Sequence, residues 1–255
     1  MGRWSRQLAP RFVAWLQIPD GRHWLDVGCG TGALTDAICR DAAPASVVAC
    51  DPAQPFIEYA RSQSGNRTVS FIVAGAGNLP SHPRGYDSIV SLLALNFFPD
   101  PAAGVHEMRL RAADQGTVAA CVWDYSGGME YLRRFWDAAL EMDPGVADRD
   151  EGRRFPICHR DALEELFRDG GLRDVRCEPI EMPMTFASFD DYWQPLLGAT
   201  GPAPAYVMSL DEDRRKALAR RLDTTLSRDA DGAIALTARA WAARGRVAWV
   251  GKRYA

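Results

Sequence analysis

A glycine-rich segment near the N-terminus constrains this chain more than any other part of its sequence. Residues 25–34 read LDVGCGTGAL, preceded by the apolar run His23–Val27 and followed by a helix-forming stretch, Thr35–Asp41. Glycines after a buried strand let the backbone turn sharply and let a ligand lie against bare main chain. The helix that follows offers unpaired N–H groups at its N-terminus. The segment therefore predicts a nucleoside-binding loop between a strand and a helix.

The rest of the first 125 residues alternates apolar runs with amphipathic stretches. The sequence predicts strands at Ser46–Asp51, Val69–Val73, Tyr86–Leu92 and Thr117–Trp123, with helices at Gln54–Ser64 and Pro101–Ala112. Strands that alternate with helices of this length indicate an α/β fold, in which a parallel sheet carries helices on both faces.

Helical patterns dominate after Trp123. We expect helices at Tyr131–Glu141, Asp161–Asp169, Phe189–Leu197, Asp211–Ser227 and Ile234–Ala243, strands at Val175–Pro179 and Arg246–Lys252, and a break at Gly198–Pro204. A chain of 255 residues suits a single α/β domain. We expect residues 1–20 to form a lid helix and 21–125 the cofactor-binding core. Residues 126–160 and 181–244 would be helical insertions on the acceptor side, and 245–255 the final strand.

Composition excludes several classes of protein. No apolar run approaches the roughly 18 residues of a membrane span, and the N-terminus lacks an apolar signal core, so neither a membrane span nor export is expected. The six cysteines form no C-x-x-C pair, which favours free thiols and a cytoplasmic location. The formal net charge of −3 provides no general electrostatic footprint for nucleic acid.

Two acidic residues narrow the identity of the ligand. Asp51 stands 23 residues after Gly28, at the end of the second strand, where an acid can accept hydrogen bonds from ribose hydroxyls. Asp26 precedes Gly28 by two residues and would repel a pyrophosphate, but it would favour the cationic amino and sulfonium groups of S-adenosylmethionine. Alternatively, Asp26 only caps the turn.

Two other functions stay open at this point. Gly28-x-Gly30-x-x-Ala33 also satisfies the dinucleotide fingerprint, so an NAD-dependent oxidoreductase is one alternative. A non-catalytic protein that binds S-adenosylmethionine or S-adenosylhomocysteine is the other.

The segments LDVGCGTGALT and VVACDP resemble the motif pair of class I S-adenosylmethionine-dependent methyltransferases, especially the ubiquinone and menaquinone biosynthesis type (methyltransferase type 11). The resemblance extends through Asn78–Pro80, Tyr86–Pro101 and Gly116–Tyr125, and the opening MGRWSRQLAPRFVAWL is similar to the N-terminal helix of one bacterial subset. It implies a Rossmann-like, doubly wound sheet of seven strands, mostly parallel with a reversed last strand. Helical insertions would form a cap on the acceptor side.

The resemblance also implies roles for individual residues. Gly28, Cys29 and Gly30 would lie along the methionine part of the cofactor, and Asp51 would hold its ribose. Pro52 would lie beside the adenine, and the backbone of Leu92 would face the cofactor's amino group. Independently of the resemblance, Trp4 and Arg6 are candidates for a lid over the cofactor, with Arg6 paired to its carboxylate. A plain surface helix is the alternative.

One position departs from the family pattern. Members of the family carry an acid in a G-D-A-x-x-L-P segment, where it binds the adenine amino group. This chain has Gly75 at that position, followed by Ala76, Gly77 and Asn78. Either the backbone of Gly75–Gly77, or Asn78, takes over the contact, or the affinity for the cofactor is lower.

Methyl transfer needs no dedicated catalytic residue, because the sulfonium is already an activated electrophile and the enzyme must mainly align the attack and exclude water. The sequence shows no Ser/His/Asp or metal-ligand cluster, so no metal is expected. Asp124 and Tyr125 are the candidate bases, and Asn96, Phe97 and Trp123 are candidates for the acceptor side. The later aromatic residues suit either a planar or apolar small-molecule acceptor or a helical core: Phe186, Phe189, Tyr192, Trp193, Tyr206 and Trp241.

Overall fold

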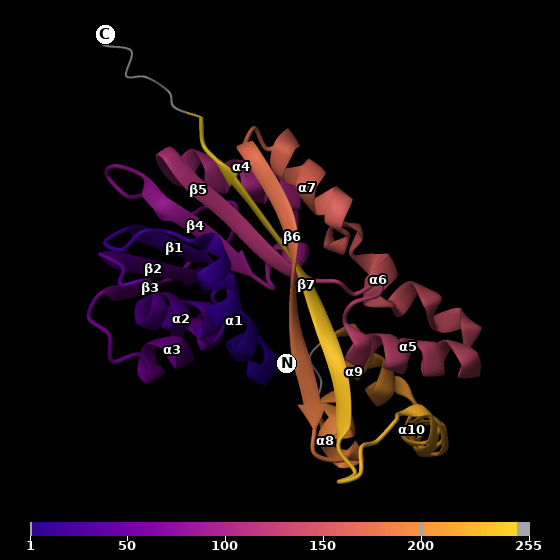
Figure 1. Cartoon of the computed structure of the whole chain (residues 1–255). Helices are drawn as coiled ribbons and strands as arrows, with labels where there is room; N and C mark the ends of the chain where they lie inside the picture. Colours follow the sequence, from indigo (N-terminus) through magenta and orange to yellow (C-terminus); the bar gives the residue numbers. More distant parts are fainter. Residues whose placement is uncertain (1, 199–200, 249–255) are drawn as a thin grey trace. The chain divides into compact units, whose positions relative to one another are not determined.

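The computed structural model describes residues 2–198 and 201–248. Seven strands form one sheet in the order β3-β2-β1-β4-β5-β7-β6 (Figure 1). They are β1 (His23–Val27), β2 (Ser46–Asp51), β3 (Val69–Val73), β4 (Tyr86–Leu92), β5 (Ala112–Trp123), β6 (Arg173–Phe186) and β7 (Ile234–Arg246). The pairs β1–β2, β2–β3, β1–β4 and β4–β5 are parallel, as the alternating pattern predicts.

The chain divides into two compact units. Among the described residues, the sheet unit contains 2–122, 160–180 and 241–248, and the helical unit contains 123–159, 181–198 and 201–240. Both later boundaries fall inside strands, since β6 and β7 each contribute residues to the two units.

The reversed last strand is confirmed, but its position in the sequence differs from the prediction. Asp124 N donates to Arg239 O at 3.0 Å, and Val247 N donates to Gly116 O at 2.9 Å. Residue numbers rise along β5 as they fall along β7, so the two strands are antiparallel. Of the expected strand at 246–252, Arg246 ends β7 and residues 249–252 lie outside the described part of the chain.

The predicted helix at Ile234–Ala243 is wrong, because these residues form most of β7. Alanine-rich sequence favours a helix in isolation. Here, however, Ile234, Ala238, Ala240 and Ala242 are fully buried. Their even spacing is the period of a strand, so pairing and burial in the sheet override the intrinsic helical preference. The structure also extends the predicted strand at Val175–Pro179 to Arg173–Phe186.

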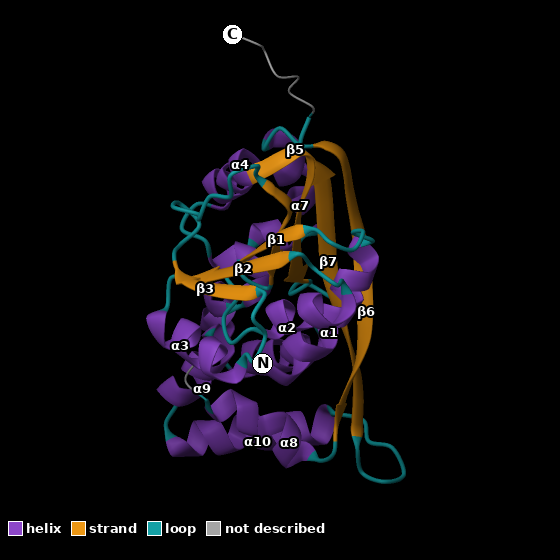
Figure 2. Cartoon of the chain, turned by 90° about the vertical axis from the view of Figure 1, so that its left-hand side faces the viewer, coloured by secondary structure: helices purple, strands orange, loops and turns teal. Residues whose placement is uncertain are grey.

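The helices of the sheet unit follow the predicted pattern: α1 (Gly2–Leu16), α2 (Ala33–Asp41), α3 (Gln54–Gln63), α4 (Pro101–Arg111) and α7 (Arg160–Asp169). Helix α1 packs against α2, and the two lie side by side in Figure 2. Its buried residues recur every three or four positions, from Trp4 to Leu16, which gives one apolar face. Arg244 Nη1 donates to Leu16 O at 2.6 Å and so satisfies a carbonyl at the end of α1.

The helical unit contains α5 (Glu130–Met142), α6 (Glu151–Arg154), α8 (Phe189–Trp193), α9 (Pro202–Ser209) and α10 (Glu212–Thr225). The helical unit also contains short 3-10 helices at Pro144–Arg149, Pro156–Cys158 and Gln194–Leu197. The break expected at Gly198–Pro204 runs into α9, which begins at Pro202 because proline is tolerated in a first helical turn. Among residues 2–198 and 201–248, no helix is long and apolar enough to cross a membrane.

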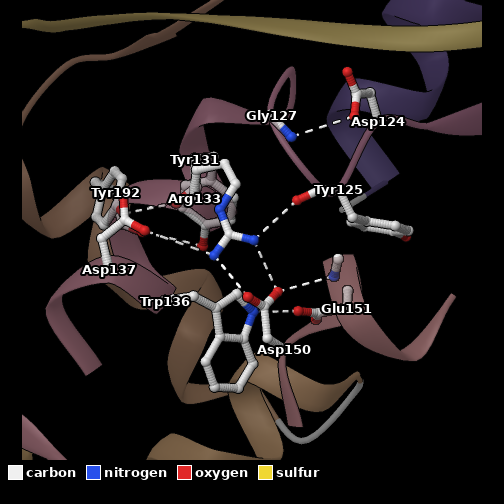
Figure 3. Close-up of polar contacts among 11 residues, drawn as sticks. Asp124, Tyr125, Gly127, Tyr131, Arg133, Trp136, Asp137, Asp150, Glu151 and Tyr192 are labelled. Atoms are coloured by element: carbon white, nitrogen blue, oxygen red, sulfur yellow. Dashed lines mark hydrogen bonds and ion pairs between the residues drawn. The ribbon is translucent and has the colours of Figure 1, made fainter. Parts of the chain in front are cut away.

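Arg133 organises the polar interior of the helical unit (Figure 3). Its Nη1 and Nη2 donate to the two oxygens of Asp150 at 2.9 and 2.8 Å, and Nη1 also donates to Tyr125 O at 3.1 Å. Asp150 in turn accepts from Gly152 N at 2.9 Å and caps α6. The bidentate pair is largely buried, with side chains 15% and 6% exposed for Arg133 and Asp150. It thereby joins α5 to the start of α6.

Replacing Asp150 with alanine should lower the free energy of unfolding by about 3–5 kcal/mol, because it leaves the buried Arg133 guanidinium uncompensated. The matched control is Asp137→Ala: Asp137 lies 3.8 Å from the same guanidinium but its side chain is 64% exposed. That change should cost no more than about 0.5 kcal/mol. Urea unfolding of both variants measures the difference. Equal losses would contradict the role given to Asp150.

Candidate functional site

The glycine-rich loop is fastened to the end of β2. Gly28 N and Cys29 N both donate to Cys50 O, at 2.8 and 3.0 Å, and Gly32 N donates back to Cys29 O at 2.9 Å. Gly28, Gly30 and Gly32 have φ values of +75°, +52° and +91°, in the left-handed region that favours glycine. The loop thus turns directly from β1 into α2, as predicted.

Gly28 is also required by close packing at the end of β4. A Cβ built on Gly28 would lie 2.4 Å from the Cβ of Ala94. The neighbouring Leu93 has a φ of +58°, and its N–H donates to Cys121 O at 2.7 Å. A leucine in this conformation is strained, and such strain is often found near ligands. Leu93 was not predicted, since nothing in the sequence marks a leucine as left-handed.

Asp51 holds the loop through both of its carboxylate oxygens. Oδ2 accepts from Gly30 N at 3.0 Å, and Oδ1 accepts from Ala53 N at 2.9 Å, just before α3. The side chain is buried. Each carboxylate oxygen has a second acceptor site, so Asp51 can still accept hydrogen bonds from a ligand.

Asp26 is a buried acid with one unsatisfied oxygen. It is 0% exposed, and its Oδ2 accepts from Thr35 Oγ1 at 2.7 Å. Its Oδ1 has no hydrogen-bond partner among the described residues. Burial raises the pKa of Asp26 to about 7; hydrogen bonds from Thr35 oppose the rise, and the charge of Asp51 adds to it. Asp26 therefore ties β1 to the first turn of α2, and its buried Oδ1 is left without a partner among the described residues.

The segment around Gly75 lies next to Pro52. A Cβ built on Gly75 would lie 3.8 Å from the Cβ of Pro52, and one built on Gly77 would meet nothing within 4 Å. Ala74 N donates to Asp51 O at 3.2 Å, which links this segment to the end of β2. Gly75 and Pro52, both predicted to lie at the adenine, are thus brought together by the fold.

Arg6 lies near the first turn of α2. Burial raises the pKa of Asp36, and the positive charges of Arg6 and Arg40 oppose this rise. Trp4, predicted with Arg6 in a lid, is buried on α1. Its burial favours the packed surface helix that was the alternative to a mobile lid.

Asn96 follows β4 in the 3-10 helix Leu95–Phe97 and is 7% exposed. Both its amide nitrogen and its amide oxygen lack hydrogen-bond partners among the described residues. Leaving a buried amide unsatisfied costs free energy, so each such group calls for an explanation. A ligand that presents both an acceptor and a donor would satisfy Asn96.

Asp124 and Tyr125, the candidate bases, belong to the helical unit. Asp124 Oδ2 accepts from Arg239 Nε and Nη2 at 2.9 and 2.6 Å, and Oδ1 accepts from Ser126 Oγ at 2.8 Å. Burial alone would raise the pKa of Asp124, but the hydrogen bonds from Arg239 and Ser126 outweigh it and lower the pKa. A fully bonded carboxylate of lowered pKa is a poor base. These contacts favour a structural role at the end of β5.

Most of the aromatic residues considered for the acceptor pack on one another. Tyr192 Oη donates to Tyr131 O at 2.8 Å, and the rings of Phe186 and Tyr192 lie 5.2 Å apart. Tyr206 packs against Trp136 at 5.8 Å. In the helical unit these side chains form the core, as the simpler of the two interpretations expects.

Residues 25–116 match the family model described as a methyltransferase domain. The sheet order with an antiparallel β7 between β5 and β6 also differs from the order 3-2-1-4-5-6 of dinucleotide-binding folds. Residues 25–116 therefore belong to a methyltransferase domain, and the sheet has the strand order of class I, S-adenosylmethionine-dependent methyltransferases. The loop, Asp26, Asp51 and Gly75 all fall within this methyltransferase domain.

Two curated relatives are methyltransferases. The chain is 31% identical to 2-methyl-6-phytyl-1,4-hydroquinone methyltransferase 2 of Oryza sativa over 61% of this chain and 40% of the relative. It is 34% identical to malonyl-[acyl-carrier protein] O-methyltransferase of Hahella chejuensis, over 58% of this chain and 56% of the relative. The chain thus spans 40% and 56% of the length of these two relatives.

Solved structures share the fold over nearly the whole chain. Phosphoethanolamine N-methyltransferase 2 of Haemonchus contortus, in complex with S-adenosylhomocysteine, has a TM-score of 0.55 at 14% identity, over 93% of this chain and 52% of that one. At this identity the likeness concerns the fold alone. The predicted fold class and the predicted family are both confirmed.

Replacing Gly28 with alanine should lower the free energy of unfolding by about 2–4 kcal/mol. The alanine would have to keep a left-handed backbone, and its Cβ would clash with Ala94. Gly77→Ala is the control, since its backbone is not left-handed and its Cβ meets nothing within 4 Å. It should change stability by less than about 0.5 kcal/mol. Chemical denaturation distinguishes the two, and an unaffected Gly28→Ala protein would argue against this close packing.

Proposed function

We propose that this chain transfers a methyl group from S-adenosylmethionine to a small-molecule acceptor, by in-line attack of the acceptor on the sulfonium methyl group. The observation that carries the proposal is the left-handed loop Gly28–Gly32 between two buried acids, Asp26 and Asp51. Bare backbone, a helix N-terminus and negative charge together suit a nucleoside that carries cationic groups.

The residues present fit the cofactor. A Cβ built on Gly30 would meet nothing within 4 Å, so the backbone at Gly30 is open to a ligand. Asp26 Oδ1 lacks a partner among the described residues and would accept from or attract a cationic group. Asp51 would accept from the ribose hydroxyls, and Gly75, Ala76, Gly77 and Pro52 would lie along the adenine. The Leu92 backbone would face the amino group, and Arg6 the carboxylate.

When bound, the cofactor supplies an activated methyl electrophile. The protein then has to position the acceptor and exclude water rather than provide a strong base. The hydrogen bonds that Asp124 accepts from Arg239 and Ser126 agree with a protein that does not need this carboxylate as a strong base. Asn96, with its unsatisfied buried amide, is the best candidate in the sheet unit for orienting an acceptor.

The chemical class of the acceptor is supported only by the relatives. One is named for a hydroquinone and the other for malonyl-[acyl-carrier protein]. An acceptor that bears oxygen is therefore the simplest extension to this chain. The aromatic residues of the helical unit do not by themselves support an apolar acceptor, because they pack on each other. The six free cysteines fit the predicted cytoplasmic location.

Calorimetric titration tests the cofactor assignment. S-adenosylmethionine and S-adenosylhomocysteine should bind one site, and NAD should give no response. Asp51→Ala should weaken binding by about 1.5–3 kcal/mol, since it removes a charge-assisted contact and the anchor of the loop. Tight NAD binding without any response to S-adenosylhomocysteine would overturn the assignment. Profiling of metabolites with labelled cofactor then separates an enzyme from a non-catalytic binding protein.

Gly75→Asp tests the departure from the family pattern. Because the backbone at Gly75 is not left-handed and Pro52 stays at van der Waals distance, aspartate fits without strain. One added hydrogen bond to adenine should be worth about 1 kcal/mol, or about fivefold in affinity. Gly65→Asp adds the same charge at an exposed position outside the proposed site, where a built Cβ meets nothing within 4 Å, and should change affinity by less than about twofold. Equal effects of the two variants would show that Gly75 does not face the adenine.

A further inference from the structure

The carboxyl group of Asp26 is held without a cationic partner. It is fully buried, and Thr35 Oγ1 bonds only Oδ2, which leaves Oδ1 unsatisfied among the described residues. A buried ionised carboxylate needs a cation or several donors, so in the free protein the neutral acid is favoured. A ligand with positive charge reverses this preference.

The groups around Asp26 strengthen the effect. Helix α2 contributes Thr35 and Asp36, strand β2 contributes Cys50 and Asp51, and the loop contributes Cys29. Burial raises the pKa of the Cys29 and Cys50 thiols, so both stay neutral. On the other side, Val90 of β4 lies opposite Asp26 in the sheet and carries no charge. The guanidinium groups of Arg6 and Arg40 act on Asp36 instead.

We propose that Asp26 is a proton switch for cofactor binding: it is protonated in the free protein and releases its proton when the cationic cofactor binds. The proposal rests on the proposed function, because it takes the ligand to be S-adenosylmethionine. The balance is one proton released to solvent for each cofactor bound, with no covalent bond formed. A neutral acid can stay buried in the ligand-free protein at a lower free-energy cost than a carboxylate. Ionisation on binding then provides the negative charge where the ligand brings positive charge.

The sign of the pH dependence follows from linkage. Burial raises the pKa of Asp26 to about 7, so below that pH binding must displace a proton. Affinity for S-adenosylmethionine should therefore rise by about tenfold per pH unit between about pH 5.5 and 6.5 and level off above about pH 7. The amino group of the ligand stays protonated over this range and does not contribute.

Titration calorimetry at about pH 6 in buffers of different ionisation enthalpy counts the protons directly, and should give close to one proton released per cofactor bound. Asp26→Asn keeps the shape of the side chain and an acceptor for Thr35, and it should bind more weakly, without proton release and without the pH slope. Asp36→Asn, an exposed acid on the same turn, is the matched control and should keep the release.

The outcomes distinguish this inference from the proposed function. Binding of S-adenosylmethionine with no proton release and a flat pH profile would overturn the proton switch and leave the methyltransferase assignment intact. Proton release that persists in Asp26→Asn would assign the titration to another group and also overturn it. Absence of any cofactor binding would overturn both.

Discussion

The hydrogen bonds between the glycine loop and the end of β2 are the interaction on which the candidate site depends. Two backbone N–H groups, those of Gly28 and Cys29, converge on Cys50 O, and the Asp51 carboxylate takes the next N–H, that of Gly30. These contacts fix three left-handed glycines in one conformation, which repays part of the conformational entropy that glycine loses on folding. The same carboxylate is the one proposed to hold the ribose, so the loop and the nucleoside would share an anchor.

Charge is distributed differently in the two units. Near the glycine loop, Asp26 and Asp51 accept only from hydroxyl or backbone N–H groups in the hydrogen bonds described, which suits a cationic ligand. In the helical unit, Asp124 and Asp150 each meet a guanidinium through two hydrogen bonds. Acids that already have a cation stabilise the fold, whereas an acid without one can contribute binding energy when a cation arrives.

Packing explains why the helical unit gives little information about the acceptor. Its aromatic side chains satisfy one another, and its polar groups form the Arg133 and Arg239 networks. The buried side-chain groups that lack a hydrogen-bond partner among the described residues lie in the sheet unit, and those at the candidate site are Asp26 Oδ1 and the Asn96 amide. Chemistry at the site is therefore better sought there, among groups whose hydrogen bonds are incomplete in the described residues.

The sequence by itself determined the α/β alternation, the glycine loop, and the placement of Asp26 and Asp51 beside that loop. These features depend on local periodicity and on a combination of glycines and acids that few other structures need. Tertiary structure decided the rest. The residues Ile234–Ala243 became a strand because pairing between β5 and β6 and burial in the sheet outweigh alanine's helical preference. Leu93 adopted a left-handed backbone, and Asp124 was paired with Arg239, 115 residues later. Both depend on neighbours distant in the chain, which no local pattern can specify.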